Sequence, residues 1–304
     1  ETDIDLDFYR KHFLSMLRML DSENFKDIIV SLHFFKSYVL LAKNRDLVEY
    51  FLKYTGSLGQ IIELFLYHEV PLVVEEALDL LLCIYIYVPI DFNPQVLEEI
   101  AEKCVCLFSD GTYSLNILLL DFIYHVCQRN KSFCHLIIEN DAFYKSSDFL
   151  LGDCDNPKKL IKKECRTFDI LLDEIFNEDI IPYVILKICI FLDYRYQFSR
   201  FAGLSMLEKM LGYGLNLADY PDIIDNFIEL TAAPKKVLLQ LIKTIMKIQD
   251  KEIITHLITN KDFRNNLSIQ CLYMLKGSKV RAKIYKLFTK FINFYQPNVD
   301  DIIV

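Results

Sequence analysis

Apolar residues recur at intervals of three and four along nearly the whole chain, and this helical pattern constrains the fold more than any other feature. Strand-like alternation is brief, and the best case, residues 83–87, lies inside a longer helical pattern. Clusters of Gly, Pro, Asn and Asp divide the pattern into helices of about 10–18 residues that are hydrophobic on more than one side. Such helices must be covered by neighbours on several faces. The sequence therefore predicts an all-α protein of closely stacked helices.

A core of bulky apolar residues also recurs along the chain. Its first three copies, residues 32–38, 77–83 and 118–124, begin 45 and 41 residues apart. Later copies lie near residues 168–172, 204–211, 241–248 and 284–292. A period of about 40–47 residues is typical of arrays in which each helical unit buries its apolar surface against the next. We therefore expect residues 1–304 to form a single α-solenoid domain of about six to seven degenerate repeats, with a polar loop or insertion near residues 145–163.

Two segments, residues 114–151 and 238–275, carry a resemblance to armadillo repeats. In the first, residues 115–123 are similar to the second helix of a repeat, and residues 130–141 to the break before the third. The chain thus resembles an armadillo/HEAT-type helical-repeat protein, which implies a right-handed α-solenoid of stacked repeats. A glycine pair normally precedes the third helix, where this chain has Asn140 and Asp141 instead. The choice between armadillo-like and HEAT-like units therefore stays open.

The resemblance also implies a binding surface, because armadillo arrays bind extended peptides or protein surfaces along a concave face lined by their third helices. This places the third helices at residues 95–108, 142–150, 182–192, 222–230 and 264–274. The polar candidates for partner binding there are Glu99, Lys103, Asn226 and Gln270. The Trp/Asn ladder of the nuclear-import adaptors does not carry over, because this chain has no Trp. Residues 235–291 also resemble the helical-repeat domain of regulatory subunit 3 of protein phosphatase 4.

No catalytic motif stands out. Eight glycines are few for phosphate-binding loops, and none of the glycine motifs of nucleotide-binding enzymes is present. His125, Cys127, Cys134 and His135 lie close in sequence, but their spacing matches no zinc motif. We therefore predict no metal site, no cofactor and no enzymatic activity. An all-α enzyme with an unrecognised site is kept as an alternative.

The charges are distributed unevenly along the chain. Residues 46–128 carry thirteen acids and two bases, whereas residues 234–290 carry thirteen bases and three acids. Near the C-terminal end, a helical spacing aligns four of the bases on one face and leaves Arg281 to the side; they are Lys279, Lys283, Lys286 and Lys290. We expect an acidic or phosphorylated protein partner at this basic end, and a basic partner at residues 46–128. The overall net charge of −8 argues against nucleic acid as the partner.

The nine cysteines are an odd number and mostly fall inside apolar helical patterns. This favours reduced, buried thiols in a cytoplasmic or nuclear protein over a secreted disulfide framework. The longest apolar run, residues 80–90, is about half the length that a membrane span requires. The sequence thus predicts a non-catalytic protein–protein interaction scaffold or adaptor without a membrane span. A regulatory subunit of a protein phosphatase is a narrower alternative.

Overall fold

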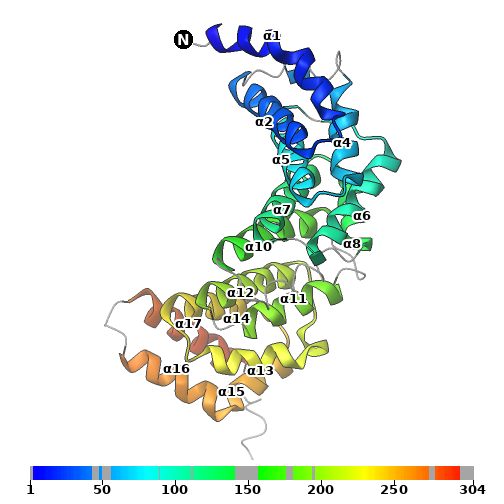
Figure 1. Cartoon of the computed structure of the whole chain (residues 1–304). Helices are drawn as coiled ribbons and strands as arrows, with labels where there is room; N and C mark the ends of the chain where they lie inside the picture. Colours follow the sequence, from blue (N-terminus) through cyan, green and yellow to red (C-terminus); the bar gives the residue numbers. More distant parts are fainter. Residues whose placement is uncertain are drawn as a thin grey trace, which may run out of the picture. The chain divides into compact units, whose positions relative to one another are not determined.

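A computed structural model contains fifteen α-helices, one short 3-10 helix and no strand among the residues that it describes (Figure 1). The described residues are 3–42, 48–49, 56–88, 90–110, 112–140, 157–175, 181–193, 196–273 and 278–294. The prediction of an all-α protein is confirmed. The chain divides into two compact units, Glu1–Ile175 and Phe176–Val304. A single continuous domain stays a prediction, and we describe each unit by itself.

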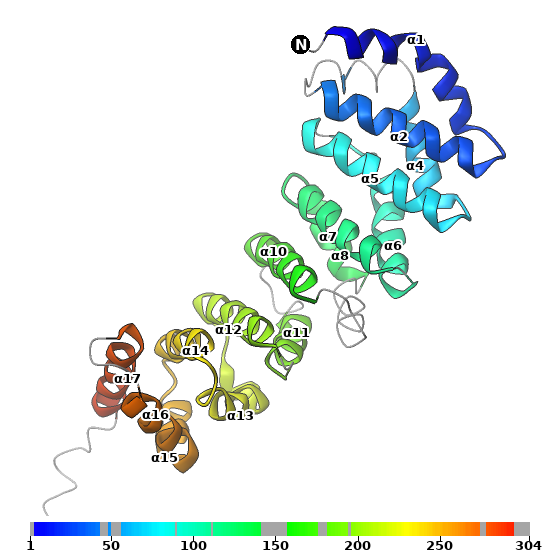
Figure 2. The ribbon, with the colours of Figure 1, turned by 60° about the vertical axis from the view of Figure 1, so that its left-hand side comes forward.

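The helices of the first unit lie in two rows (Figure 2). In one row, each helix packs against the next; its members are α2 (Phe25–Ala42), α5 (Pro71–Tyr87), α7 (Tyr113–Cys127) and α10 (Pro157–Ile175). We call this the ladder row. The second row consists of α4 (Ser57–Tyr67), α6 (Pro94–Asp110) and α8 (Lys131–Glu139). Helix α1 (Asp3–Leu20) packs against α2 and α4.

The second unit repeats this arrangement. Its ladder row consists of α12 (Gln197–Gly212), α14 (Lys235–Lys247) and α17 (Lys279–Phe294). Its second row consists of α11 (Ile181–Asp193), α13 (Pro221–Leu230), α15 (Lys251–Thr259) and α16 (Lys261–Tyr273). The short 3-10 helix η1 (Leu217–Asp219) precedes α13. The described helices of the unit thus form two layers, with most of their buried apolar side chains between them.

The repeat predicted from the sequence is confirmed in the ladder row. Successive ladder helices begin 38 to 46 residues apart, and the seven recurring apolar cores lie in them, except for Ile248, which directly follows α14. Hydroxyl groups occupy matching places in two of these helices. Thr167 of α10 donates to the Leu120 carbonyl of the preceding ladder helix at 3.3 Å, and Thr244 of α14 donates to the Leu204 carbonyl at 3.1 Å.

One sequence-based assignment needs correction, and another stays a prediction. The helices assigned as third helices, residues 95–108, 182–192, 222–230 and 264–273, lie in the second row, and their place on a binding face stays a prediction. The segment 142–150 lies outside the described residues. The loop expected over residues 145–163 is wrong for residues 157–163, which form the start of α10. Pro157 is the first residue of that helix, where its missing N–H costs no hydrogen bond.

Large aromatic side chains join the two rows. The ring of Phe122 on α7 lies 6.3 Å from Phe65 on α4 and 6.4 Å from Phe133 on α8, and all three are fully buried. In the second unit, Phe263 on α16 lies 6.1 Å from Phe291 on α17. Burial of each such ring contributes about 2–3 kcal/mol. Because no helix buries all of its apolar surface alone, the rows depend on each other.

One glycine sets a close helix crossing. A Cβ atom on Gly203 of α12 would lie 3.0 Å from the Cβ of Phe191 and 3.1 Å from a methyl of Leu192, both on α11. Real Cβ atoms rarely come so close. The absence of a side chain at this position therefore lets α11 and α12 pack directly against each other.

Candidate protein-interaction surface

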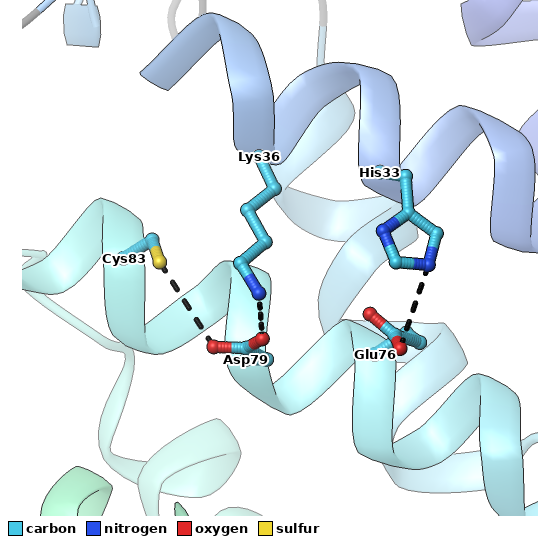
Figure 3. A network of polar contacts seen from close by, with 5 residues as sticks. All are labelled: His33, Lys36, Glu76, Asp79 and Cys83. Atoms are coloured by element: carbon cyan, nitrogen blue, oxygen red, sulfur yellow. Dashed lines mark hydrogen bonds and ion pairs between the residues drawn. The ribbon is translucent and has the colours of Figure 1, made fainter. Parts of the chain in front are cut away.

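We call the solvent-exposed side of the ladder row its outward face. On this face, polar side chains of successive ladder helices contact each other (Figure 3). Lys36 on α2 forms an ion pair with Asp79 on α5, and His33 Nε2 lies 3.5 Å from the Glu76 carboxylate one turn away. The Cys83 thiol approaches the second oxygen of Asp79 at 4.0 Å. Partial burial lowers the pKa of Lys36, but Asp79 more than compensates, so the pKa of Lys36 is raised. Polar contacts between these side chains therefore join α2 to α5 on this face.

A similar link recurs two repeats further, with the lysine on the later of the two helices. Lys163 on α10 forms an ion pair with Asp121 on α7, and the Arg166 guanidinium lies 3.6 Å from the centre of the Tyr124 ring. Two of the acids counted in residues 46–128, Asp79 and Asp121, are therefore paired with lysines from outside that interval. The acidic field expected there is weaker than the sequence count suggests.

The ladder row of the second unit is basic instead. Its three helices contain eleven bases and a single acid, Glu208, whereas the four helices of the second row in the same unit contain four bases and six acids. The ladder-row bases are Arg200, Lys209, Lys235, Lys236, Lys243, Lys247, Lys279, Arg281, Lys283, Lys286 and Lys290. The charge asymmetry seen along the sequence is thus sorted between the two rows of one unit.

Contacts between α12 and α14 show which way the α14 side chains project. Lys236 Nζ lies 4.7 Å from the centre of the Phe201 ring, and Gln240 Nε2 donates to the Glu208 carboxylate at 2.6 Å. Lys247 lines an open hollow of about 400 Å³ beside the end of α12. The rest of its lining is Ser205, Glu208, Lys209, Gly212 and Tyr213. The outward face of α14 therefore continues onto α12.

The five basic candidates of α17 have different environments. Lys290 Nζ donates to the carbonyls of Ile245 and Met246 at 3.1 Å, and also to that of Ile248, at the C-terminal end of α14. Burial lowers the pKa of Lys290. Arg281 donates to the Tyr285 hydroxyl at 3.1 and 3.2 Å, and this hydrogen bond raises the pKa of Arg281.

The other three α17 candidates lie along the same stripe as Lys290. Lys279 and Lys286 are exposed, and Lys283 is half-buried. Because these residues share a helix face with Lys290, the stripe lies on the side of α17 next to α14.

The four other sequence candidates lie elsewhere, in the second row. Glu99 and Lys103 are on α6 of the first unit, where Glu99 accepts a hydrogen bond from the Tyr67 hydroxyl. Asn226 on α13 donates to the Asp222 carbonyl at 3.2 Å, and Gln270 is on α16. Within the second unit, Asn226 and Gln270 thus lie on second-row helices, whereas the lysine stripe is on a ladder-row helix.

The structure adds two residues that the sequence analysis counted only as charge, Lys243 and Lys247 of α14. Both are exposed. Lys243 and Lys247 follow Lys236 by seven and eleven residues. This spacing in the sequence could have predicted that the three lysines share one helix face.

Of the eight described cysteines, three are buried, four are half-buried and one, Cys106, is exposed. Burial raises the pKa of the Cys104 and Cys127 thiols well above their usual range, and together with Asp79 it raises the pKa of Cys83 to about 11. Burial likewise lowers the pKa of His125. Within the described ranges, no group of three or more metal-ligating side chains occurs, and no helix is both long and apolar enough to cross a membrane. Cys154 lies outside those ranges.

Comparisons with solved structures show the fold. A computationally designed armadillo repeat protein for modular peptide recognition is 14% identical, with a TM-score of 0.57 over 77% of this chain and 99% of its own. An engineered protein is 17% identical, with a TM-score of 0.51 over 78% of this chain and 98% of its own. UNC-45 from Drosophila melanogaster is 17% identical, with a TM-score of 0.50 over 97% of this chain, which spans only 38% of UNC-45.

No family model and no curated protein matches the chain. The fold is nevertheless that of an armadillo/HEAT-type α-solenoid, and the resemblance inferred from the sequence is confirmed at this level.

Proposed function

We propose that this chain is a non-catalytic scaffold that binds protein partners along the outward face of its ladder row. The observation that carries the proposal is the sorting of charge in the second unit, where the ladder row holds eleven bases and one acid. Packing does not require this arrangement, because the buried sides of the same helices are apolar. A surface that concentrates one sign of charge attracts partners of the other sign.

The construction of the surface supports the same function. Its helices are held on their inner sides by the second row and along the row by each other, so the outward face exists before a partner arrives. A preformed surface loses little conformational entropy on binding. The designed armadillo repeat protein with the same fold was made for modular peptide recognition, which favours a peptide or protein segment as the ligand.

The partner's charge follows from the surface. We propose an acidic or phosphorylated partner at the basic ladder row of the second unit. We also propose a basic partner at residues 46–128, where Asp79 and Asp121 are already paired with lysines. A cytoplasmic or nuclear location is proposed from the reduced cysteines. Raised thiol pKa values support a structural role for the cysteines over a nucleophilic one.

Affinity purification from cell extract with matched charge variants tests the proposal. The ladder variant carries Lys243→Glu, Lys247→Glu and Lys286→Glu. The control carries Lys251→Glu, Lys261→Glu and Arg264→Glu on exposed positions of the second row, with the same change in net charge.

We expect specific proteins to be retained by the wild type and the control and lost by the ladder variant. Equal retention by all three proteins, or recovery of no specific protein, would contradict the proposal. A metallophosphatase catalytic subunit among the retained proteins would identify the narrower role of a phosphatase regulatory subunit.

A further inference from the structure

The geometry of the second unit points to a more specific ligand: we infer that the surface over α12, α14 and α17 binds an extended protein segment rich in Asp and Glu. This inference rests on the proposed function and names the chemistry of its ligand. The surface is defined by the outward lysines of α14, Lys236, Lys243 and Lys247, and by Lys283 and Lys286 of α17.

The α14 lysines share one helix face. Residues 236, 240, 243 and 247 are spaced by four, three and four, which places them on one side of a helix. Gln240 and Lys236 reach the α12 residues Glu208 and Phe201, so this side lies over the junction of α12 and α14. Lys236, Lys243 and Lys247 are exposed along it, whereas Gln240 is buried. The α14 lysines therefore form a line on the outward surface that is interrupted at Gln240.

A second line of lysines runs beside the first. Lys290 binds the carbonyl groups at the end of α14, so its helix face on α17 borders α14. Lys283 and Lys286 precede Lys290 by seven and four residues and share that face. The helices that carry the two lines are in contact. Positive charge therefore continues across neighbouring helices instead of ending at one of them.

The separation of the helices sets the spacing of the ligand's acids. Packed helices lie about 8–10 Å apart, and an extended chain advances about 3.3 Å per residue. Carboxylates two to three residues apart would therefore meet successive ladder helices. A segment with an acid at about every third position fits this surface better than one with a single acidic block.

The lysines of the surface suit the separate carboxylates of an acidic segment. A lysine ammonium group acts as a point charge without a preferred plane, whereas arginine recognises both carboxylates and phosphates through its planar fork. The helices α14 and α17 carry eight lysines and one arginine, Arg281, which is bonded to Tyr285. A long nucleic acid would also meet the repulsion of a chain with a net charge of −8.

Fluorescence anisotropy with synthetic peptides tests the inference directly. The probe is a labelled peptide of about twelve residues with Glu at every third position. Its comparison peptides have the same composition with all Glu in one block, Lys in place of Glu, and phosphoserine in place of Glu. A single-stranded oligonucleotide of similar length is measured in parallel. Each is titrated with the full chain, the ladder variant K243E/K247E/K286E and the control K251E/K261E/R264E.

We expect the periodic Glu peptide to bind the wild type and the control equally, and the ladder variant about tenfold more weakly, since three exposed ion pairs are lost. Binding should also weaken as salt rises. No binding of the periodic peptide, equal loss in the control, or tighter binding of the phosphoserine peptide or the oligonucleotide would overturn the inference. If the peptides fail while the ladder variant still loses its cellular partners, the inference fails and the proposed function stands.

Discussion

The ion pair between Lys36 and Asp79 is the most direct test of how the ladder helices are joined. It links α2 to α5 across 43 residues of sequence, on the outward face of the first unit. Replacing Asp79 by Asn removes the charge with little change in shape, and replacing Lys36 by Met keeps the apolar stem. The double-mutant cycle of the two changes isolates the energy of their interaction.

The magnitude follows from the burial of the pair. Two unit charges about 4 Å apart attract by about 4 kcal/mol at an effective dielectric constant of about 20. The side chains are 27% and 28% exposed, so each has lost part of its hydration, and this cost offsets most of the attraction. Exposed pairs measure about 0.2–1 kcal/mol. We therefore expect a coupling of about 1–1.5 kcal/mol for this half-buried pair.

Urea unfolding followed by circular dichroism measures the coupling, with the exposed Glu98→Gln on α6 as a control for the loss of a carboxylate. The control should change the free energy of unfolding by less than about 0.5 kcal/mol. Because the pKa of Lys36 is raised above its usual 10.5, the pair's contribution is present at lower pH and disappears as the pH rises through that raised value. A coupling below about 0.3 kcal/mol, or one unchanged at strongly alkaline pH, would refute this account.

Three further results are expected. Arg129 donates to the carbonyls of Tyr85 and Ile86 at the end of α5, so Arg129→Met should lower the free energy of unfolding by about 1–2 kcal/mol, measured by urea unfolding; an unchanged midpoint would contradict the capping role. Gly203→Ala should cost about 1–3 kcal/mol, because the added methyl group meets the side chains of α11; calorimetry that shows no loss would mean that the two helices separate without cost. Iodoacetamide at neutral pH should modify the exposed Cys106 in the folded protein, but the buried Cys104 only after unfolding. Mass spectrometry measures the modification of each cysteine. Modification of both at similar rates would contradict the burial of Cys104.

The helices and their repeat could be predicted from the sequence because both depend on local pattern. A stripe of apolar residues at helical spacing forms a helix in almost any surroundings, and the recurrence of bulky cores at residues 32–38, 77–83 and 118–124 reports units of one size. Those three segments lie in α2, α5 and α7, successive members of one row. The four lysines of α17 could be placed on one face for the same reason.

The row to which a helix belongs could not be predicted. Helices of both rows have wide apolar surfaces, so the sequence pattern does not show which row α6 and α13 join. The sequence also did not distinguish Lys290, which caps α14, from Lys286, which is exposed. Both the row that a helix joins and the environment of a lysine depend on contacts with a helix about 40 residues away in the sequence.

The amino-acid sequence by itself determined that this protein is a stack of similar helical units with a basic end, since a helical period and a count of charges are properties of nearby residues. Only the tertiary structure decided which side chains share an outward surface, which charges are compensated, and that Lys243 and Lys247 continue the stripe begun by Lys283 and Lys286. The physical reason is that packing between successive units brings together residues that no local pattern relates.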